Sequence, residues 1–223
     1  MSVKPLICVP IIQKDMNSAL KSANNAKKLG ADILEFRIDA LENPDSEKIW
    51  KIIDDVDYRF IATNRMQKEG GFFKGSESER TNMLIEVAEQ VDFVDIELQT
   101  ASKYRSKVIK ASKSSIISFH DFDRTPDLKE LLNVVEREKE LGDIAKFAVM
   151  PQRIQDTLIV LEVLSQVQNT IGISMGELGR YTRIIAPLFG SPLTFASSDI
   201  KSAPGQLDIQ TTRKFLGQLG DWR

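Results

Sequence analysis

The sequence contains very little cysteine and histidine. Cys8 is the only cysteine and His120 the only histidine among 223 residues. A single cysteine excludes an intrachain disulfide and favours a reducing, cytoplasmic setting. Structural zinc sites are usually built from several Cys and His ligands, so we expect no metal. Any chemistry must therefore come from ordinary side chains.

Other signatures are missing as well. The sequence has neither a dinucleotide-binding glycine fingerprint nor a phosphate-binding loop. The apolar stretch from Leu6 to Ile12 is short and broken by Pro10, and no apolar run approaches the length of a membrane span. The chain has 30 basic and 32 acidic residues, a net charge of −2. We therefore expect no nucleic-acid or membrane partner, and a small molecule as the substrate.

Short β-type runs recur along the whole chain, with helical patterns between them. The runs are Leu6–Val9, Ile33–Arg37, Phe60–Thr63, Phe93–Glu97, Ser115–Ser118, Ile144–Val149, Thr170–Ser174 and Leu193–Ala196. The helical patterns include Ser18–Leu29, Glu77–Gln90, Asp127–Leu141, Arg153–Val167 and Thr211–Leu219. This α/β alternation predicts a parallel sheet with helical crossovers.

Eight such units without a linker rich in Pro, Gly or Ser favour one compact domain over two. We predict a single (β/α)8 TIM barrel over residues 1–223, with a doubly wound open sheet as the alternative. The charged stretch from Lys68 to Arg80 contains three glycines and predicts a long mobile loop after the third strand. Such a loop can act as a lid.

The two-residue period of the strands predicts which side chains enter the barrel. Apolar residues mark the face that helices cover, as Leu34 and Phe36 do in the second run. The alternate positions point inward, and many are polar: Glu35, Arg37, Asp39, Thr63, Arg65, Asp95, Glu97, Ser118, His120 and Lys146. Burying charges without partners is costly, so a polar interior indicates function. Several of these residues lie near the carboxyl ends of their strands, where barrel enzymes build active sites.

Lys146 and His120 are the candidate catalytic side chains. A lysine buried near other cations, here Arg37 and Arg65, presents a neutral amine that can attack a carbonyl. The iminium formed acidifies a proton on the adjacent carbon. His120 can take that proton and return it to a leaving hydroxyl, and Glu69 can orient its ring.

The same residues also allow purely structural roles. A single histidine at a strand end is often a hydrogen-bonded structural group, and Lys146 can serve in an ion pair. Glu35 and Arg37 can form a buried pair that holds the barrel together. Met175, taken alone, is a core residue.

These residues and their neighbours resemble the type I 3-dehydroquinate dehydratase family, in order and through nearly the whole chain. The segments that carry the resemblance are Glu35-Phe36-Arg37-Ile38-Asp39, Thr63-x-Arg65 with Glu69-Gly70-Gly71, Ser118-x-His120-x-Phe122 with Thr125-Pro126, Asp143 to Pro151 around Lys146, Met175-Gly176-Glu177-Leu178-Gly179 with Arg183, and Gly190-Ser191, Thr194-Phe195 and Pro204-Gly205-Gln206.

The resemblance implies a hydro-lyase of the shikimate pathway that converts 3-dehydroquinate to 3-dehydroshikimate without a cofactor. Lys146 would form an imine with the C3 carbonyl, His120 would abstract the C2 proton, and Glu69 would orient His120. A homodimer is implied by the family alone. The implied substrate contacts are Glu35, Arg37, Arg65, Arg183 on the carboxylate, Ser202 and Gln206 on a closing loop, Met175 and Phe195.

Two other functions stay open. A class I Schiff-base aldolase shares the barrel and the lysine chemistry but breaks a carbon–carbon bond. A non-catalytic barrel that binds a polyol acid needs no lysine at all. The combination of Lys146, His120 and Glu69 favours dehydration over both.

Overall fold

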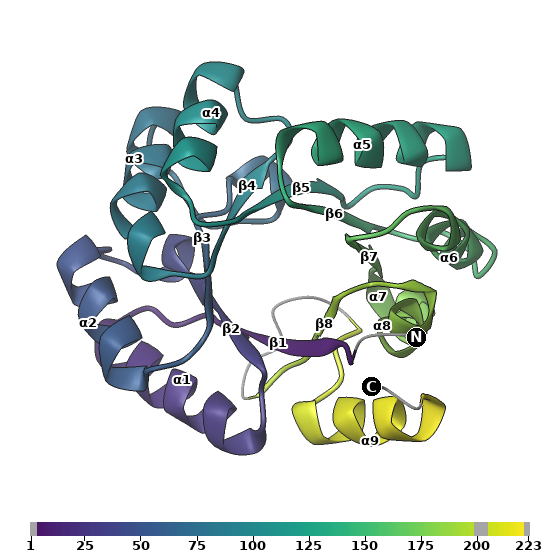
Figure 1. The fold of residues 1–223 in the computed structure, drawn as a ribbon, viewed down its shortest axis with the longest axis horizontal. Helices are drawn as coiled ribbons and strands as arrows, with labels where there is room; N and C mark the ends of the chain where they lie inside the picture. Colours follow the sequence, from purple (N-terminus) through teal and green to yellow (C-terminus); the bar gives the residue numbers. More distant parts are fainter. Residues whose placement is uncertain (1–3, 199–204, 221–223) are drawn as a thin grey trace.

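The centre of the molecule is a ring of eight strands (Figure 1). The computed structural model describes residues 4–198 and 205–220. The strands are β1 (Leu6–Ile11), β2 (Ile33–Arg37), β3 (Phe60–Thr63), β4 (Phe93–Glu97), β5 (Ser115–Asp121), β6 (Ile144–Val149), β7 (Thr170–Ser174) and β8 (Leu193–Phe195). Every pairing between them is parallel.

The strand order confirms the predicted barrel. The order is β7-β6-β5-β4-β3-β2-β1-β8, so that β1 pairs with both β2 and β8. Within the described residues no ladder joins β7 to β8, and the ring is therefore nearly closed. A doubly wound sheet reverses its strand order at a switch point. Because consecutive strands follow one another here without a reversal, that alternative is wrong.

Helices surround the strands on the outside of the ring (Figure 1). The α-helices are α1 (Met16–Leu29), α2 (Ser46–Val56), α3 (Glu77–Val87), α4 (Ser102–Ala111), α5 (Leu128–Leu141), α6 (Asp156–Gln166), α7 (Gly176–Gly179), α8 (Thr182–Ile185) and α9 (Ile209–Leu219). Short 3-10 helices are η1 (Ile38–Ala40), η2 (Gln67–Glu69), η3 (Ala88–Gln90) and η4 (Ala186–Phe189).

Side-chain caps fix where five of these helices begin. Asp15, Asp45, Ser76, Asp127 and Asp208 each accept a hydrogen bond from the backbone N–H three residues further on, at the starts of α1, α2, α3, α5 and α9. Each cap satisfies an amide that has no partner inside the helix and contributes about 1 kcal/mol.

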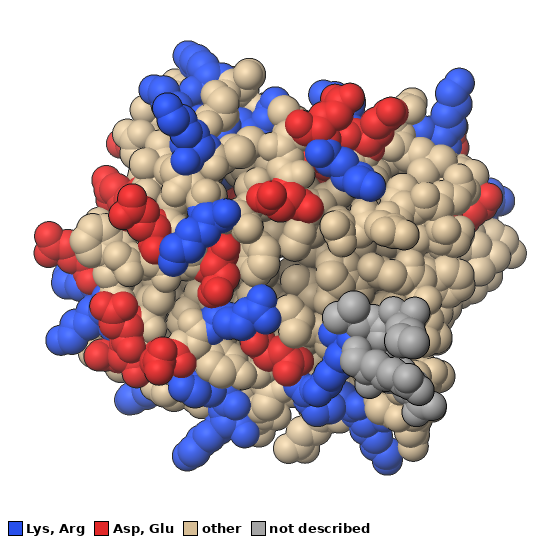
Figure 2. Space-filling view, in the orientation of Figure 1, with Lys and Arg blue, Asp and Glu red and all other residues tan. Residues whose placement is uncertain are grey.

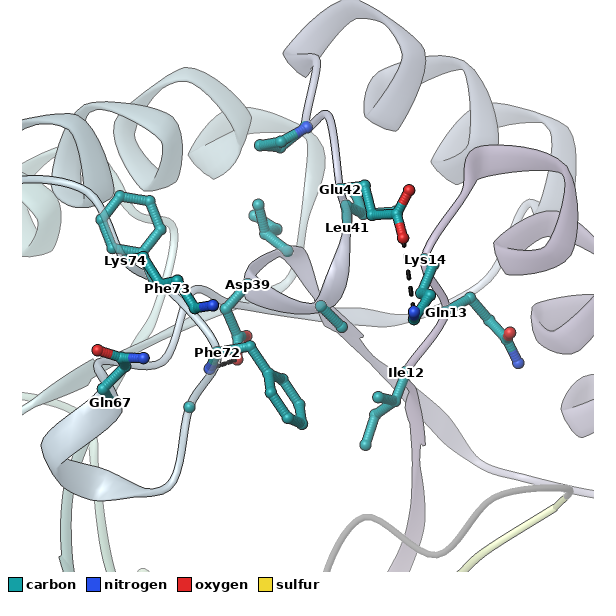
Figure 3. A pocket seen from close by; sticks show the side chains of 14 residues that line it. Ile12, Gln13, Lys14, Asp39, Leu41, Glu42, Gln67, Phe72, Phe73 and Lys74 are labelled. Atoms are coloured by element: carbon teal, nitrogen blue, oxygen red, sulfur yellow. Dashed lines mark hydrogen bonds and ion pairs between the residues drawn. The ribbon is translucent and has the colours of Figure 1, made fainter.

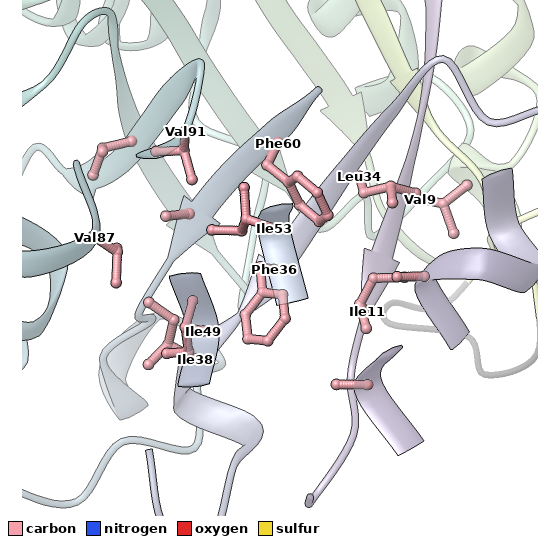
Figure 4. Close-up of a cluster of buried hydrophobic side chains, with 14 of the residues drawn as sticks. Val9, Ile11, Leu34, Phe36, Ile38, Ile49, Ile53, Phe60, Val87 and Val91 are labelled. Carbon is pink, nitrogen blue, oxygen red and sulfur yellow. The ribbon is translucent and has the colours of Figure 1, made fainter. Parts of the chain in front are cut away.

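The main core lies between the outer face of the strands and the helices. Figure 4 shows part of it, where Phe36 and Phe60 of β2 and β3 meet Ile49 and Ile53 of α2. The apolar strand positions predicted to face the helices belong to this layer, including Leu34 and Phe36. The predicted direction of the strand side chains is therefore confirmed.

The barrel interior is divided into two layers along its axis. Its amino-terminal half is apolar and contains Cys8, Ile33, Ile61, Ile116, Ile171 and Leu193. One step further along the strands the inward positions become charged, for example Glu35 after Ile33 and Lys146 after Ile144. The polar part of the interior is thus confined to the carboxyl-terminal half of the barrel. The apolar layer of the amino-terminal half lies directly beneath it.

The prediction of a long loop from Lys68 to Arg80 is wrong at both ends. η2 includes Lys68, and α3 already begins at Glu77 behind a capping box in which Ser76 and Glu79 bond to each other's backbone amides. Arg80 is fully buried. The irregular segment is therefore only 70–76, because the charged residues after it belong to a packed helix.

Acidic and basic side chains are mixed over the face shown in Figure 2 and do not form separate patches of one sign. On the face shown in Figure 2, positive and negative side chains alternate, mainly over the α1 to α5 side of the ring. Among the described helices none is long and apolar enough to cross a membrane.

Candidate active site

A polar pocket of about 80 Å³ lies at the carboxyl ends of the strands. Every predicted site residue lines it except Ser202, which lies outside the described residues. The lining residues are Glu35, Arg37, Arg65, Glu69, Gly70, His120, Phe122, Lys146, Ala148, Ile173, Met175, Arg183, Phe195 and Gln206. Residues from six of the strands and their following loops thus converge on one space.

Lys146 enters the pocket from β6 and is buried. Its Nζ donates a hydrogen bond to Asp95 Oδ2 at 2.7 Å and lies 3.8 Å from Glu35 Oε1. The ring of Phe195 covers it, with a distance of 4.6 Å from Nζ to the ring centroid. Arg37 and Arg65 line the same pocket, as predicted, but the charged groups in direct contact with Nζ are carboxylates.

Asp95 connects Lys146 to the rest of the interior. Its Oδ1 accepts hydrogen bonds from Arg65 Nη2 at 2.7 Å and from the Ser118 hydroxyl at 2.6 Å. Burial opposes ionisation of this carboxyl, but Arg65 and Lys146 outweigh it and hold the pKa of Asp95 below its ordinary value. Asp95 is therefore an anion that fixes the Lys146 amine and the Arg65 guanidinium side by side.

Further ion pairs connect Arg65 to helix α3. Arg65 Nη1 lies 3.2 Å from Glu97 Oε1, and Glu97 Oε2 lies 2.7 Å from Arg80 Nη1 on α3. Arg80 also contacts Glu77 at 2.7 Å. Charges of alternating sign thus run from α3 to Lys146, and each buried ion has an opposite partner, as such burial requires.

His120 and Glu69 form a close pair at the ends of β5 and η2. The distance from His120 Nδ1 to Glu69 Oε2 is 2.9 Å, and the backbone N–H of His120 donates to the same oxygen at 3.0 Å. The predicted contact is confirmed. Because Glu69 occupies Nδ1, the other ring nitrogen, Nε2, is the one left to face a ligand.

Burial sets the protonation of this pair. Burial, together with the cations Arg65 and Lys146, lowers the pKa of His120 well below 6.5. Burial also raises the pKa of Glu69 to about 8, with Arg65 opposing the rise. The two groups touch and therefore titrate as a unit. A neutral imidazole is the form that can accept a proton.

His120 and Lys146 lie on adjacent strands. In the ladder between β5 and β6, Ser118 pairs with Lys146 and His120 pairs with Ala148. Neighbouring strands are about 4.8 Å apart and two residues along a strand span about 6.6 Å. The register therefore brings an amine and an imidazole to the same side of one pocket.

Arg37 and Glu35 are separately partnered. Arg37 donates to Asp39 from Nε at 2.9 Å and from Nη2 at 2.7 Å. Glu35 accepts from the Thr63 hydroxyl at 2.8 Å and lies beside Lys146. Among the described ion pairs Arg37 pairs with Asp39 and Glu35 with Lys146, so the structural alternative of a Glu35–Arg37 pair is not observed there.

The remaining side of the pocket comes from the C-terminal part of the chain. Arg183 on α8 is buried, and burial lowers its pKa to about 10. Met175, Phe195 and Gln206 are buried around the same space. Met175 thus belongs both to the interior apolar cluster and to the pocket wall.

Sequence reasoning missed part of the lining. Gly70, Phe122, Ala148 and Ile173 line the pocket without having been proposed as site residues. Ala148 could have been found by strand parity, since it follows Lys146 by two positions. Phe122 closes the pocket beside His120, with ring centroids 6.5 Å apart.

No metal centre is indicated by the side chains. Within the described part of the chain, no three His, Cys, Asp or Glu side chains are grouped so that they could hold a metal ion. The reactive groups in the pocket are an amine and an imidazole, which are the nucleophile and the base of imine chemistry. The fold and the site define a barrel enzyme of the (β/α)8 class with a lysine on its sixth strand.

The chain belongs to the type I 3-dehydroquinase family, whose model matches residues 7–222. It is 51% identical over 213 residues to a 3-dehydroquinate dehydratase of Methanothermobacter thermautotrophicus, covering 96% of both chains. A 3-dehydroquinate dehydratase of Methanobrevibacter smithii is 48% identical, with 94% of both chains covered.

Solved structures agree with this assignment. The crystal structure of the type I 3-dehydroquinate dehydratase from Clostridium difficile has a TM-score of 0.90 at 33% identity and covers 97% of this chain and 92% of its own. That of 3-dehydroquinate dehydratase from Geobacillus kaustophilus has a TM-score of 0.89 at 30% identity, with 96% and 91% covered. The predicted family and the predicted fold are both confirmed.

Proposed function

We propose that this protein is a 3-dehydroquinate dehydratase, a carbon–oxygen hydro-lyase that works through an imine on Lys146. The observation that carries the proposal is the convergence of Lys146, His120 and Glu69 on one pocket, in a chain of the type I family. A polyol acid with a ketone is the substrate class that such a pocket suits, because it offers cations, carboxylates and a nucleophile together.

The reaction begins at the amine. Lys146 Nζ transfers its proton to Glu35, whose Oε1 lies 3.8 Å away, and attacks the C3 carbonyl of 3-dehydroquinate. The carbinolamine loses water and becomes an iminium, which draws electrons from the neighbouring C2–H bond. Phe195 and the buried walls keep bulk water from the imine while it persists.

His120 then carries the elimination. Its neutral imidazole takes the C2 proton through Nε2, while Glu69 at Nδ1 stabilises the imidazolium. The resulting enamine expels the C1 hydroxyl, which leaves as water with the proton from His120. Hydrolysis of the conjugated imine releases 3-dehydroshikimate and restores the amine, so that no oxidant or reductant is consumed.

The charged walls orient the substrate. Arg183 receives the carboxylate, since a guanidinium matches it with two parallel hydrogen bonds. Arg37, Arg65 and Glu35 contact the hydroxyl groups, and Met175 and Phe195 bound the ring. Gln206 bounds the substrate from the segment after β8. Ser202, the other residue that the resemblance implies there, lies outside the described residues.

We further propose that the reaction needs no metal or cofactor, because the imine itself supplies the electron-withdrawing group. Turnover that survives dialysis against a strong chelator is the expected result. Loss of turnover that added metal restores would contradict it.

We also propose that the protein is a homodimer in a reducing, cytoplasmic compartment. Light scattering and sedimentation test the dimer.

The experiment that tests the function is an ultraviolet assay for the conjugated enone of the product, with purified protein and 3-dehydroquinate. Borohydride added with substrate should abolish turnover and leave a covalent adduct detectable by mass spectrometry. Lys146→Ala should show neither turnover nor adduct, whereas Lys139→Ala, an exposed lysine on α5, should match the wild type.

The alternatives predict different outcomes of the same assay. An aldolase would form the adduct with a cleavable sugar and give no enone from 3-dehydroquinate. A non-catalytic barrel would bind the compound equally well as wild type and as Lys146→Ala, without turnover by either.

A further inference from the structure

Two cavities lie next to each other at the carboxyl ends of the strands. The pocket around Lys146 is the smaller, and a cavity of about 850 Å³ at the ends of β1, β2 and β3 is the larger (Figure 3). Arg37 and Gly70 line the pocket, whereas Asp39 and Phe72 line the larger cavity. The wall between the cavities is therefore built from two short segments, 37–39 and 70–73.

One carboxylate joins the two segments. Asp39 accepts hydrogen bonds from Arg37 Nε at 2.9 Å and Nη2 at 2.7 Å, and its Oδ2 also accepts the backbone N–H of Phe72 at 3.0 Å. The side chain of Asp39 is completely buried, and that of Arg37 is 10% exposed. Figure 3 shows Asp39 and Phe72 beside each other in this wall.

Phe72 holds Arg37 from a second direction. Its ring lies 5.7 Å from the Arg37 guanidinium carbon, within the range of a cation–π contact. The guanidinium is thus fixed by a carboxylate and by a ring, and the carboxylate also holds the backbone that carries the ring. These contacts leave Arg37 a single orientation toward the pocket.

The segment that Asp39 holds is the continuation of the Glu69 turn. Gly70 has a φ of +78°, and a Cβ at Gly71 would lie 1.9 Å from the carbonyl oxygen of Arg65. The chain therefore passes directly over the Arg65 backbone, with Gly71 N–H bonded to Met66 O at 3.0 Å. Asp39 fixes the end of this turn at Phe72, and Glu69 lies at its beginning.

We propose that Asp39 is a positioning residue that aligns Arg37 with the substrate and holds the turn that presents Glu69 to His120. Asp39 lines only the larger cavity, so it acts through its neighbours. The inference rests on the proposed function, because only there do Arg37 and Glu69 have roles in binding and catalysis.

Asp39→Asn is the variant that tests the inference. An amide keeps the shape and one acceptor but turns a donor toward Arg37, so that the two-bond pair cannot form. We expect KM for 3-dehydroquinate to rise by about tenfold or more and the borohydride adduct still to form. Asp45→Asn is the matched control, since this exposed N-cap tolerates asparagine and should leave both constants unchanged.

A double-mutant cycle separates positioning from general destabilisation. If Asp39 acts through Arg37, then in an Arg37→Met background Asp39→Asn should change KM by less than about twofold. Equal effects of Asp39→Asn in both backgrounds, or kinetics like those of Asp45→Asn, would overturn the inference. Absence of turnover by the wild type would instead overturn the proposed function.

If Asp39→Asn does not fold, Phe72→Leu decides the question. The Phe72 side chain is 54% exposed, so that its replacement is compatible with folding. The variant keeps the backbone N–H and loses the ring over Arg37. A rise in KM of about two- to fivefold is expected from the lost cation–π contact, and an unchanged KM would refute the clamp on Arg37.

Discussion

Glu138 is a buried carboxyl that the proposed mechanism does not use. It lies on α5 at the helical spacing of Leu131 and Val135, the face that packs on the strands, and is 0% exposed. Neither of its oxygens has a hydrogen-bond partner among the described residues. Burial raises the pKa of Glu138 well above 4.5, with Asp95 and Glu69 adding to the rise and the nearby Lys146 opposing it. We predict that Glu138→Met stabilises the protein.

Two separate effects determine how much Glu138→Met raises the free energy of unfolding. Burying a neutral polar group without a hydrogen bond costs about 1–3 kcal/mol, and Met, which is long and flexible, removes that cost while filling the space. The second effect depends on pH. Because the folded-state pKa is raised, the native protein keeps a proton that the unfolded chain releases above pH 4.5. Wild-type stability therefore falls as pH rises, by up to about 1.4 kcal/mol per pH unit.

Urea unfolding of wild type, Glu138→Met and Glu138→Gln at several pH values between 4 and 8 separates the effects. Gln removes the titration but stays polar, so it should equal the wild type at the acid end and exceed it increasingly as pH rises. Met should exceed Gln by a constant amount of about 1–3 kcal/mol. Each kcal/mol corresponds to about 2–4 °C in Tm for a chain of this size. A Met variant less stable than wild type at neutral pH would refute the reasoning.

Two further predictions concern the catalytic pair. His120→Ala should still give the borohydride adduct but turn over about 10²–10⁴-fold more slowly; normal turnover would remove His120 from the mechanism. Glu69→Gln should lower kcat by about tenfold or more, because the imidazolium loses the carboxyl group that is bonded to Nδ1. Since the folded-state pKa of Glu69 is raised to about 8 from 4.5, wild-type stability falls between these two values and Glu69→Gln should be the more stable protein at pH 8, by about 1–3 kcal/mol in urea unfolding. Equal stability at pH 8 would contradict the raised pKa.

The strands were predictable because their signal is local. Apolar residues at alternate positions define a strand and its covered face, and the residues between them must enter the barrel. Five of the eight predicted strands have the observed bounds, whereas β1 and β5 extend further and β8 ends one residue earlier. Their ends depend on pairing with a neighbouring strand, as at His120 and Asp121 opposite Ala148 and Val149.

The ion pairs were less predictable because they depend on register. Parity placed Glu35, Arg37, Asp39, Asp95 and Lys146 inside the barrel, but parity does not say which acid meets which base. Asp95 faces Lys146 across β5, the strand that lies between β4 and β6. Such a contact between non-adjacent strands follows from the curvature of the closed barrel, which no short sequence pattern encodes.

Buried charges on helices were the least visible feature. Glu138 and Arg80 occur in segments rich in charged residues, where exposure is the default expectation. The spacing of Glu138 from Leu131 and Val135 was a usable signal, since it places the carboxyl on the apolar stripe of α5. Arg80 gave no such signal, because its burial depends on Glu97 at the end of a strand distant in sequence.

The alternating chain of charges explains how a barrel can keep an amine beside a base at its centre. Each buried cation from Arg80 through Arg65 to Lys146 lies between carboxylates, so that none is buried alone. Loss of one member leaves its partner unpaired, at a cost of about 3–5 kcal/mol. The lysine is thereby held at one position and orientation before the substrate arrives, and the proton it must release has an acceptor in contact. The same carboxylates stabilise the charged form of Lys146, so the amine must lose a proton before it can attack the substrate carbonyl.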